Sequence, residues 1–353
     1  MTNIDTIHDA IYRMNGGGIQ MDGHKGVLVC GEIAEGKLAP ITIELLGVGR
    51  KLASELGEDL SALLMGSKTG GLGQEAIAYG ADNVYVAEDS LLDQYNSDAY
   101  TQVAADLCRK ALPSIMLLGH TDIGCDLAPR LNGRLGGGLS MDCLALSVDP
   151  ATKFLVSTRP VFGGNAHATM VSKSARPQMA TVRPKIVPPA ERNDSRQGKV
   201  IPVEGKVDPS ALKVKVVDRI KEEVEGIKLE DAEVVVSGGR GVGSAQNFGM
   251  LKELAGLLGG AIGATRPACD EGWAPVTLQV GQSGKVVSPK LYIAVALSGA
   301  MSHIAGCLGS KTIVAINKDK EANIFSVAHF GIVADYKEVL PALTAKLKEL
   351  KSK

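Results

Sequence analysis

Several polar and glycine residues in the last third of the chain follow apolar runs, where they could contact a ligand. Thr265 and Arg266 come directly after one run, and Ser298 and Gly299 come after another, with His303 shortly beyond. An arginine is permanently positive, a histidine can be protonated, and the start of a helix attracts negative charge. This chemistry suits an anionic or phosphate-bearing ligand.

A glycine-rich turn upstream carries a further arginine, Arg240. The glycines around it are Gly238, Gly239, Gly241 and Gly243. Glycines allow the backbone to approach a ligand closely. Their spacing is G-x-G-x-G rather than the G-x-G-x-x-G of dinucleotide-binding turns, so this turn is either part of a ligand site or purely structural.

A second glycine loop, formed by residues 281–284, also has two interpretations. The hydroxyl of Ser283 and the backbone amides could donate hydrogen bonds to a heterocycle or a phosphate, or the loop could be a plain hairpin turn. Similarly, His303 could be a satisfied core histidine. We favour a ligand role, because His303 follows a strand end and lies in the second turn of a helix whose start suits the negative edge of a reduced flavin.

Two later apolar strands end at Asn317 and Asp335. A carboxylate after a parallel strand can accept hydrogen bonds from ribose hydroxyls, although either residue could also be a simple cap. Because parallel strands of one sheet end at the same edge, we expect these groups to converge on one ligand.

The second half of the chain must position these residues through alternating strands and helices. Apolar runs predict strands at residues 232–239, 290–299, 312–318 and 329–335, and helices at residues 247–259 and 339–350. Alternation of this kind predicts a parallel sheet with helices on both faces. We therefore expect a second, smaller doubly wound domain here.

The first half of the chain also alternates apolar strands with helices. It predicts strands at residues 26–33, 61–66, 83–89, 114–120 and 143–148, and helices at residues 41–56, 74–81, 97–112 and 124–135. Residues 153–173 and 177–184 are expected to be extended, with a turn at Gly163, Gly164 and Asn165, and to form antiparallel strands on the edge of the same sheet. The predicted fold class is thus α/β, with two doubly wound domains, each a mostly parallel sheet flanked by helices.

A stretch rich in proline and charge, residues 183–210, keeps neither a helical nor a strand period. We place the domain seam there, with an N-terminal domain at residues 1–208 and a C-terminal domain at residues 209–353. Two domains also suit a chain of 353 residues, which is longer than a single core usually grows.

Composition excludes several classes of function. With 38 basic and 39 acidic side chains the net charge is −1, which offers no surplus for nucleic acid or an anionic membrane. The 6 cysteines include no C-x-x-C pair, so a zinc or iron-sulfur site is not expected. We expect the cysteines to be buried free thiols. The first fifteen residues resemble no targeting signal, and no apolar run could span a bilayer, so we expect a cytoplasmic protein.

The motifs GGRG, GATRPACD, QVGQSGK, LYIAVALSGAMSH, TIVAINKD and GIVAD, in this order and spacing, closely resemble the alpha subunit of electron-transfer flavoproteins. The resemblance is strong after Glu233 and looser before it, through TRPVFGGN and RPQMATVRP. It implies one FAD, held mainly by the C-terminal domain, in a heterodimer with a beta subunit. It also implies electron transfer from flavin dehydrogenases, such as the acyl-CoA dehydrogenases of fatty acid β-oxidation, to a quinone-linked or iron-sulfur oxidoreductase, with or without electron bifurcation.

The resemblance further implies roles for individual residues. Arg240 and Thr265 would contact the phosphate region, Arg266 would lie over the isoalloxazine, and Gln282 with Ser283 would serve flavin N5. His303, as a cation with Arg266, would stabilise the singly reduced anionic flavin near its C2 carbonyl, and Asn317 and Asp335 would hold the adenosine end. The full set of expected cofactor-binding residues is Arg240, Thr265, Arg266, Val280, Gly281, Gln282, Ser283, Ser298, Gly299, Ala300, Met301, Ser302, His303, Asn317 and Asp335, of which Arg266, Ser283 and His303 would tune the redox potential.

Three positions depart from the family pattern. Thr265 replaces a usual serine and Ser283 a usual threonine, and both changes keep a hydroxyl, whereas Ser302 replaces a common glutamine and shortens that side chain. The N-terminal cysteine cluster of some relatives is absent, so we expect no attached ferredoxin module. The alternatives are a nicotinamide-dependent dehydrogenase, which the missing G-x-G-x-x-G disfavours, and a cofactor-free structural partner.

Overall fold

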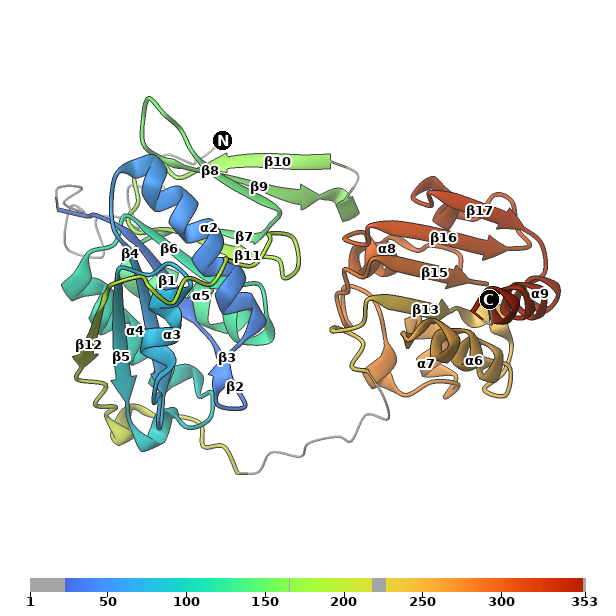
Figure 1. The fold of residues 1–353 in the computed structure, drawn as a ribbon, viewed down its shortest axis with the longest axis horizontal. Coiled ribbons are helices and arrows are strands. Elements are labelled where there is room, and N and C mark those ends of the chain that lie inside the picture. The colour runs from blue at the N-terminus through green and yellow to red at the C-terminus, as the bar shows by residue number, and fades with distance from the viewer. Residues whose placement is uncertain (1–22, 165, 218–226, 352–353) are drawn as a thin grey trace, which may run out of the picture. The chain divides into compact units, whose positions relative to one another are not determined.

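The computed structural model describes residues 23–164, 166–217 and 227–351 (Figure 1). The chain forms two compact units, one of residues 1–160 with 167–219, and one of residues 161–166 with 220–353. The sequence prediction about the N-terminal fifteen residues lies outside the described residues, as does Asn165 of the predicted turn. In the described part of the chain, no helix combines the length and apolarity needed to cross a membrane.

The first unit is built on a seven-stranded sheet in the order β12-β5-β4-β1-β6-β11-β7. Its strands are β1 (Val27–Gly31), β4 (Leu60–Gly66), β5 (Asn83–Glu88), β6 (Ile115–Gly119), β7 (Gly138–Cys143), β11 (Gln178–Val182) and β12 (Lys199–Val203). The pairs along this sheet are parallel. All five residues of β1 are buried, as a central parallel strand requires, because helices cover both faces. The predicted α/β class is confirmed here.

Helices cover the two faces of this sheet in pairs. They are α2 (Pro40–Leu56), α3 (Leu72–Ala78), α4 (Ser97–Ala111) and α5 (Asp122–Leu135). Residues of α2 and α3 share one apolar core, and residues of α4 and α5 share another. Between β1 and α2 the chain forms a small antiparallel pair, β2 (Ile33–Ala34) with β3 (Lys37–Leu38). The four helices lie where the apolar periodicity predicts them.

Two expectations about the sheet edges were wrong. Strands β8 (Ala145–Val148), β9 (Leu155–Val161) and β10 (Ala166–Val171) form a separate three-stranded sheet, in which β8 and β9 are antiparallel, instead of extending the main sheet. Strand β11, from the second extended segment, is parallel and lies inside the main sheet between β6 and β7. Its five residues are all buried, which explains its apolar composition.

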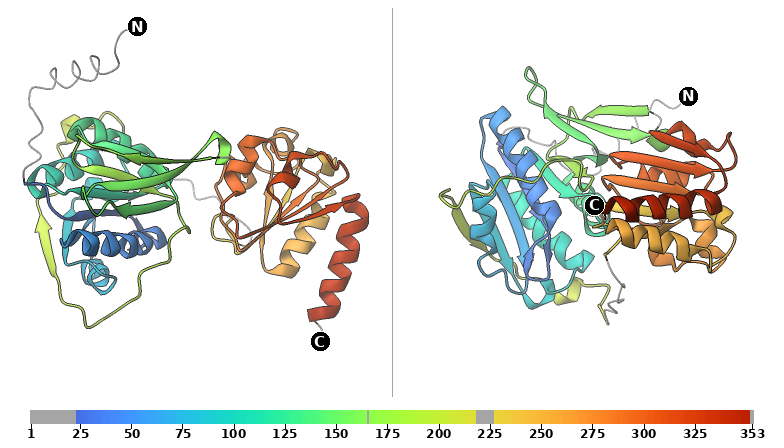
Figure 2. Two further views of the ribbon diagram at one scale, coloured as in Figure 1. Left: turned by 90° about the horizontal axis from the view of Figure 1, so that it is seen from above. Right: turned by 45° about the vertical axis from the view of Figure 1, so that its right-hand side comes forward.

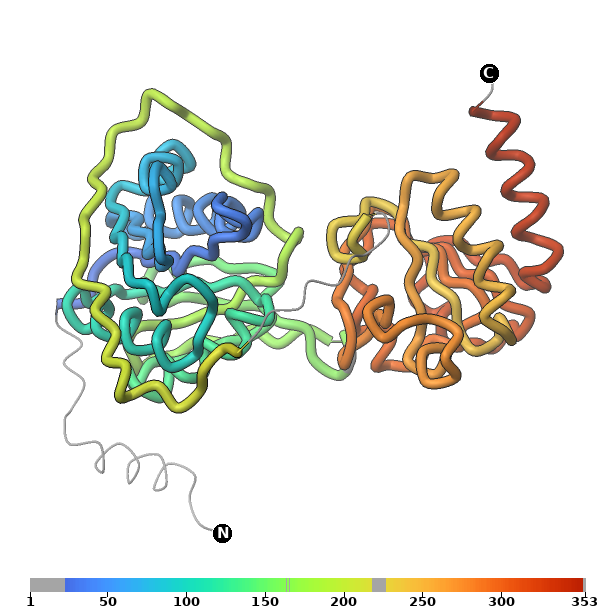
Figure 3. The backbone as a smooth tube through the Cα atoms, turned by 90° about the horizontal axis from the view of Figure 1, so that it is seen from below, coloured from blue at the N-terminus to red at the C-terminus, as the bar shows by residue number. Residues whose placement is uncertain are grey.

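The proline-rich stretch also contains a strand that the sequence did not predict. After β11 the chain runs around the first unit (Figure 3), and β12 then pairs in parallel with β5 at the sheet edge. Proline is compatible with this strand because an edge position leaves one side of the backbone unpaired. The boundary between residues 208 and 209 stays a prediction.

The second unit has a five-stranded parallel sheet in the order β14-β13-β15-β16-β17. Its strands are β13 (Val234–Gly238), β14 (Ala261–Ala264), β15 (Leu291–Val295), β16 (Thr312–Asn317) and β17 (Phe330–Val333), and its helices are α6 (Phe248–Leu258), α7 (Arg266–Asp270), α8 (Met301–Cys307) and α9 (Tyr336–Lys351). The chain leaves β13 towards β14 on one side and leaves β15 towards β16 on the other. The loops at the carboxyl ends of β13 and β15 therefore diverge, and ligands of such sheets bind at this point.

Alternate residues of each strand enter two different cores. Tyr292, Ala294 and Ile304 belong to the core on the α8 face, while Ile293 and Val295 pack with α6 and α9 on the other face. The helices that flank this sheet are visible in Figure 2. Helices α6 and α9 lie against each other, and Lys348 Nζ donates to Glu253 Oε1 at 2.7 Å. The layers hold the carboxyl ends of the strands at one edge of the sheet.

Candidate functional site

A cavity of about 570 Å³ lies at the carboxyl ends of β13, β14, β15 and β16. It gathers most of the residues that the sequence predicts for a cofactor site: Arg240, Thr265, Arg266, Val280, Gly281, Ser283, Ser298, Gly299, Ala300, Ser302, His303 and Asn317. Gln282, Met301 and Asp335 do not line it. The structure therefore brings together groups that are distant in sequence because their strands end at one edge.

The glycines after β13 are needed for packing against the end of β15. Gly239 N donates to Val295 O at 3.0 Å, and Gly241 N donates to Ala296 O at 3.1 Å. A Cβ on Gly241 would lie 2.6 Å from that same Ala296 oxygen. The glycine-rich turn is thus structural, and it also brings Gly241 and Arg240 to the cavity wall.

The loop after β15 holds two unusual backbone conformations. Ala296 has φ of 49°, a left-handed value that costs about 1–3 kcal/mol for a residue with a side chain. Gly299 has φ of 78°, and a Cβ there would lie 2.3 Å from the backbone nitrogen of Ile324. Ile324 N in turn donates to Ser298 O at 3.0 Å. This turn therefore places Ser298 and Gly299 in the cavity wall at a conformational cost.

The loop of residues 279–285 forms another side of the cavity. Gln279, which is buried, donates from Nε2 to Ser283 Oγ at 3.0 Å and so orients that hydroxyl. Gln282 N donates to Ser302 O at 2.7 Å, which ties the loop to α8, while the Gln282 side chain is exposed. Of the two predicted residues, Ser283 faces the cavity, and the glutamine that contacts it is Gln279.

Two arginines supply positive charge to the cavity. Arg240 and Arg266 are both exposed, and Arg266 Nε lies 3.6 Å from Asp270 Oδ2 on the same helix. Arg266 is the first residue of α7. The Thr265 hydroxyl makes no capping hydrogen bond to α7, although the residue is buried at the cavity wall.

His303 lies in the first turn of α8 rather than the second, and the residue is 5% exposed. Its Nδ1 lies 2.9 Å from Val280 O, and its Nε2 lies 2.9 Å from Tyr292 Oη. Burial lowers the pKa of His303 to about 4, although the Val280 carbonyl opposes this. Burial therefore favours a neutral ring near pH 7, which differs from the cationic His303 expected from sequence.

Asn317 and Asp335 line a second cavity of about 250 Å³, which shares Gly241, Ala296 and Asn317 with the first. Asn317 Nδ2 donates to Leu297 O at 2.8 Å, and Asn317 Oδ1 accepts from Asp319 N at 3.0 Å. Asp335 Oδ1 accepts from Lys337 N at 2.9 Å in the first turn of α9. Each side chain thus makes hydrogen bonds within the protein. The residues shared by the two cavities join them along the strand ends.

Two family models match the chain. Residues 27–207 match the electron transfer flavoprotein domain, and residues 228–308 match the electron transfer flavoprotein FAD-binding domain. The electron transfer flavoprotein subunit alpha of Megasphaera elsdenii is 46% identical over 330 residues, which are 93% of this chain and 98% of that protein. The same subunit of Thermoanaerobacterium thermosaccharolyticum is 44% identical over 331 residues, 94% of this chain and 100% of that one.

The chain belongs to the electron transfer flavoprotein alpha-subunit family. Protein FixB of Clostridium saccharobutylicum is a further relative, 45% identical over 327 residues, which are 93% of this chain and 97% of that protein. The resemblance and the fold class predicted from sequence are confirmed, and FAD is the cofactor of the domain that residues 228–308 match.

The groove formed by the two cavities fits the cofactor of the electron transfer flavoprotein family. Two arginines, Arg240 and Arg266, line the first cavity and can balance a diphosphate. The first cavity alone is within the usual range of about 300–1,000 Å³ for ligand pockets. The residues present therefore suit an elongated anionic dinucleotide.

Sequence reasoning missed several lining residues, among them Gln279, Leu297 and Asp319. Gln279 belongs to the QVGQSGK motif, so attention to the whole motif could have found it. Leu297 contributes to the wall although it is 3% exposed, and no polar signal marks it.

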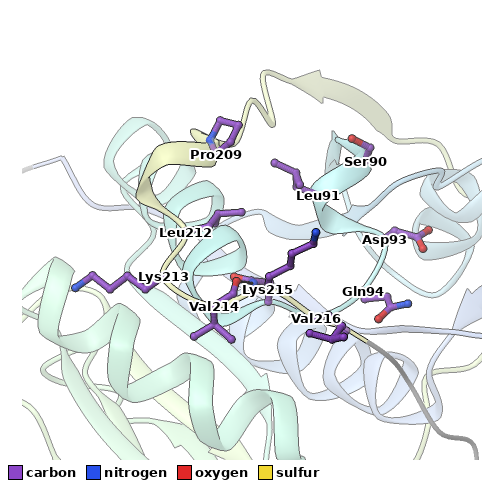
Figure 4. Close-up of a pocket in the computed structure, with 12 residues that line it drawn as sticks. Ser90, Leu91, Asp93, Gln94, Pro209, Leu212, Lys213, Val214, Lys215 and Val216 are labelled. Carbon is purple, nitrogen blue, oxygen red and sulfur yellow. Dashed lines mark hydrogen bonds between the residues drawn. The ribbon is translucent and has the colours of Figure 1, made fainter.

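A larger cavity, of about 700 Å³, lies in the first unit and contains none of the predicted residues. Figure 4 shows Leu91, Leu212, Val214 and Val216 around it, contributed by the segment after β5 and the segment that follows residue 208. Its polar groups, including Asp93 and Lys215, come from exposed chain segments rather than from strand ends. We assign it no role in an electron transfer flavoprotein.

The neutral His303 predicts acid sensitivity of the second unit. A folded pKa of about 4 against 6.5 means that the unfolded chain gains a proton first, so stability falls as pH drops from about 6.5 to about 4. The full loss is about 3 kcal/mol. We expect denaturant unfolding, followed by fluorescence of the single tryptophan Trp273, to show this loss in the native protein and not in His303→Gln.

His329→Gln, which changes an exposed histidine of the same unit, is the matched control and should keep the loss. Equal acid sensitivity in the native protein and His303→Gln would contradict the assignment of His303 as a buried neutral group.

Proposed function

We propose that this chain holds FAD in the groove at the carboxyl ends of β13 to β16 and, with a beta subunit, carries electrons between redox proteins. The observation that supports this most strongly is the convergence of Arg266, Ser283 and His303 on one cavity, from α7, the loop of residues 279–285 and α8. Family membership supports the same function independently.

In this proposal the bound FAD supplies the capacity to accept and release electrons. The chain provides the environment. Arg240 and Thr265 bind the phosphate region, while Arg266, which is permanently charged, favours added negative charge on the ring system. The Ser283 hydroxyl, oriented by Gln279, donates a hydrogen bond to the ring. Asn317, on the wall shared by the two cavities, and Asp335, in the second cavity, hold the adenosine end.

His303 has a different part from the one expected from sequence. As a neutral ring it cannot offset negative charge by its own charge, so in this proposal Arg266 is the main cationic group near the ring system. The remaining expected contacts, Val280, Gly281, Ser298, Gly299, Ala300 and Ser302, line the cavity through loop backbone and small side chains. We keep Gln282, in the loop of residues 279–285, and Met301, at the start of α8, as proposed contacts.

The partners follow from the family resemblance. We propose that electrons come from flavin dehydrogenases, such as the acyl-CoA dehydrogenases of fatty acid β-oxidation, and leave to a quinone-linked or iron-sulfur oxidoreductase in the cytoplasm. Bifurcation would need a second flavin. Counting flavins per heterodimer of the co-purified complex tests it, since two support bifurcation and one supports simple transfer.

The nicotinamide dehydrogenase alternative is tested by the same preparation. We expect the complex to be yellow, and its flavin absorbance to bleach when a reduced flavin dehydrogenase is added. A colourless complex that binds only NAD would overturn the proposed function.

Asp335→Ala tests the assignment of the adenosine end. A hydrogen bond to a charged group contributes about 1.5–3 kcal/mol, so we expect FAD to bind about 10-fold to 100-fold more weakly. Loss of the helix cap should separately cost about 1 kcal/mol of stability. Asp335→Asn keeps the cap and is the control for stability, so it should lose affinity without unfolding more easily. If Asp335→Ala lost stability while its FAD dissociation constant stayed unchanged, the residue would be a cap alone.

A further inference from the structure

A fully buried chain of hydrogen bonds crosses one wall of the proposed flavin cavity. It joins Tyr292 on β15 to His303 on α8 and ends at the carbonyl of Val280, with 2.9 Å between the donor and acceptor atoms at each step. Tyr292 is 0% exposed and His303 is 5% exposed. Tyr292 does not itself line the cavity, whereas His303 and Val280 do.

The chemistry of the three groups fixes where the protons lie. A carbonyl oxygen can only accept, so Nδ1 of His303 must carry the hydrogen that it shares with Val280 O. Nε2 of the neutral ring then has a lone pair, and the hydroxyl of Tyr292 must donate to it. Both ring nitrogens are therefore used by the protein, and the ring is held as the Nδ1–H tautomer.

The groups that surround this chain support a neutral ring. Burial raises the pKa of Tyr292 well above its ordinary value and raises that of Cys307, on the next turn of α8, to about 12. Both are uncharged near pH 7. Among the described residues that line the cavity, the charged ones are Arg240, Arg266 and Asp319, and all three are exposed.

We propose that Tyr292 is a positioning residue of the flavin site, whose hydroxyl donates to Nε2 of His303 and holds the ring against the loop of residues 279–285. The inference rests on the proposed function, because it assigns a role towards the flavin. His303 also adjoins the bond from Gln282 N to Ser302 O, so the same tyrosine helps to join α8 to the loop that carries Ser283.

Replacing the hydroxyl has a defined consequence. In Tyr292→Phe, Nε2 loses its donor, whereas Nδ1 keeps its bond to Val280 O and therefore its hydrogen. The Nε2 lone pair is left without a partner in a buried position, so the environment of Nε2 changes while the tautomer does not.

The test is nitrogen NMR of the FAD-loaded alpha-beta complex with ¹⁵N-labelled histidine, in which His303→Gln assigns the signal. We expect His303 to show a protonated Nδ1 and an unprotonated Nε2 in the native complex. In Tyr292→Phe we expect the Nε2 signal to shift, because the hydrogen bond from the hydroxyl is lost. The midpoint potential of the bound FAD, measured in parallel, should also differ from that of the native complex, because His303 lines the proposed flavin cavity.

Tyr336→Phe is the matched control, since Tyr336 is also buried in the second unit and donates to a backbone carbonyl, Val242 O, at 2.7 Å. It should leave the His303 signals unchanged. A native complex with the hydrogen on Nε2, or a Tyr292→Phe complex with unaltered His303 signals, would overturn the inference. The nitrogen NMR spectrum of the native complex tests the inference by itself, even if Tyr292→Phe folds poorly. Failure of FAD to bind the native complex would instead reject the proposed function.

Discussion

Gly299→Ala should unfold the second unit more easily and release its FAD. The residue has φ of 78°, and a Cβ there would lie 2.3 Å from Ile324 N. A left-handed conformation alone costs a residue with a side chain about 1–3 kcal/mol, and the contact with backbone adds to it. We expect a loss of about 3 kcal/mol or more in the free energy of unfolding, measured by Trp273 fluorescence in denaturant.

FAD affinity should fall with it, by more than 10-fold, because the substitution pushes apart Ser298 and Ile324, whose 3.0 Å bond shapes the cavity wall. Gly256→Ala is the control. Gly256 is exposed in α6 and a Cβ there meets nothing within 4 Å, so alanine should stabilise by about 0.5–1 kcal/mol and leave FAD binding unchanged. Equal behaviour of the two variants would show that the turn at Gly299 is not strained.

Asn317→Ala should weaken FAD binding by about 10-fold to 100-fold. Its side chain joins two loops of the groove, through Leu297 O at 2.8 Å and Asp319 N at 3.0 Å. Alanine leaves the carbonyl of Leu297, a residue that is 3% exposed, without this donor. The measurement is the FAD dissociation constant of the complex, by fluorescence titration.

Asn317→Asp separates the two bonds. The aspartate can still accept from Asp319 N but cannot donate to Leu297 O, and it adds a negative charge beside an anionic cofactor. We therefore expect affinity at least as weak as that of the alanine variant. Native affinity in Asn317→Asp would show that the bond to Leu297 O does not shape the site.

The strands that end at the groove could be predicted because each is a short apolar run followed by glycine or a polar residue. Residues 234–238, 291–295 and 312–317 are strands, as expected. Strands β11 and β12 were harder, because their position in the sheet depends on pairing with distant β6, β7 and β5 rather than on any local pattern. A single apolar run does not say whether a strand is at an edge or inside a sheet.

The chemical state of the site was less predictable than its residues. The LYIAVALSGAMSH motif places His303 beside the cavity, but its charge depends on burial and on two partners. One, Tyr292, is eleven residues upstream, and the other, Val280, is on a different loop. Gln279 was missed for a related reason, since its contact with Ser283 appears only when the loop folds back.

The most direct test of the central claim is the experimental structure of the complex with FAD bound. The account predicts that the isoalloxazine lies in the groove at the carboxyl ends of β13 to β16, in contact with Arg266, Ser283 and the wall formed by His303. FAD bound at another place, or these three side chains pointing away from a common ligand, would contradict it.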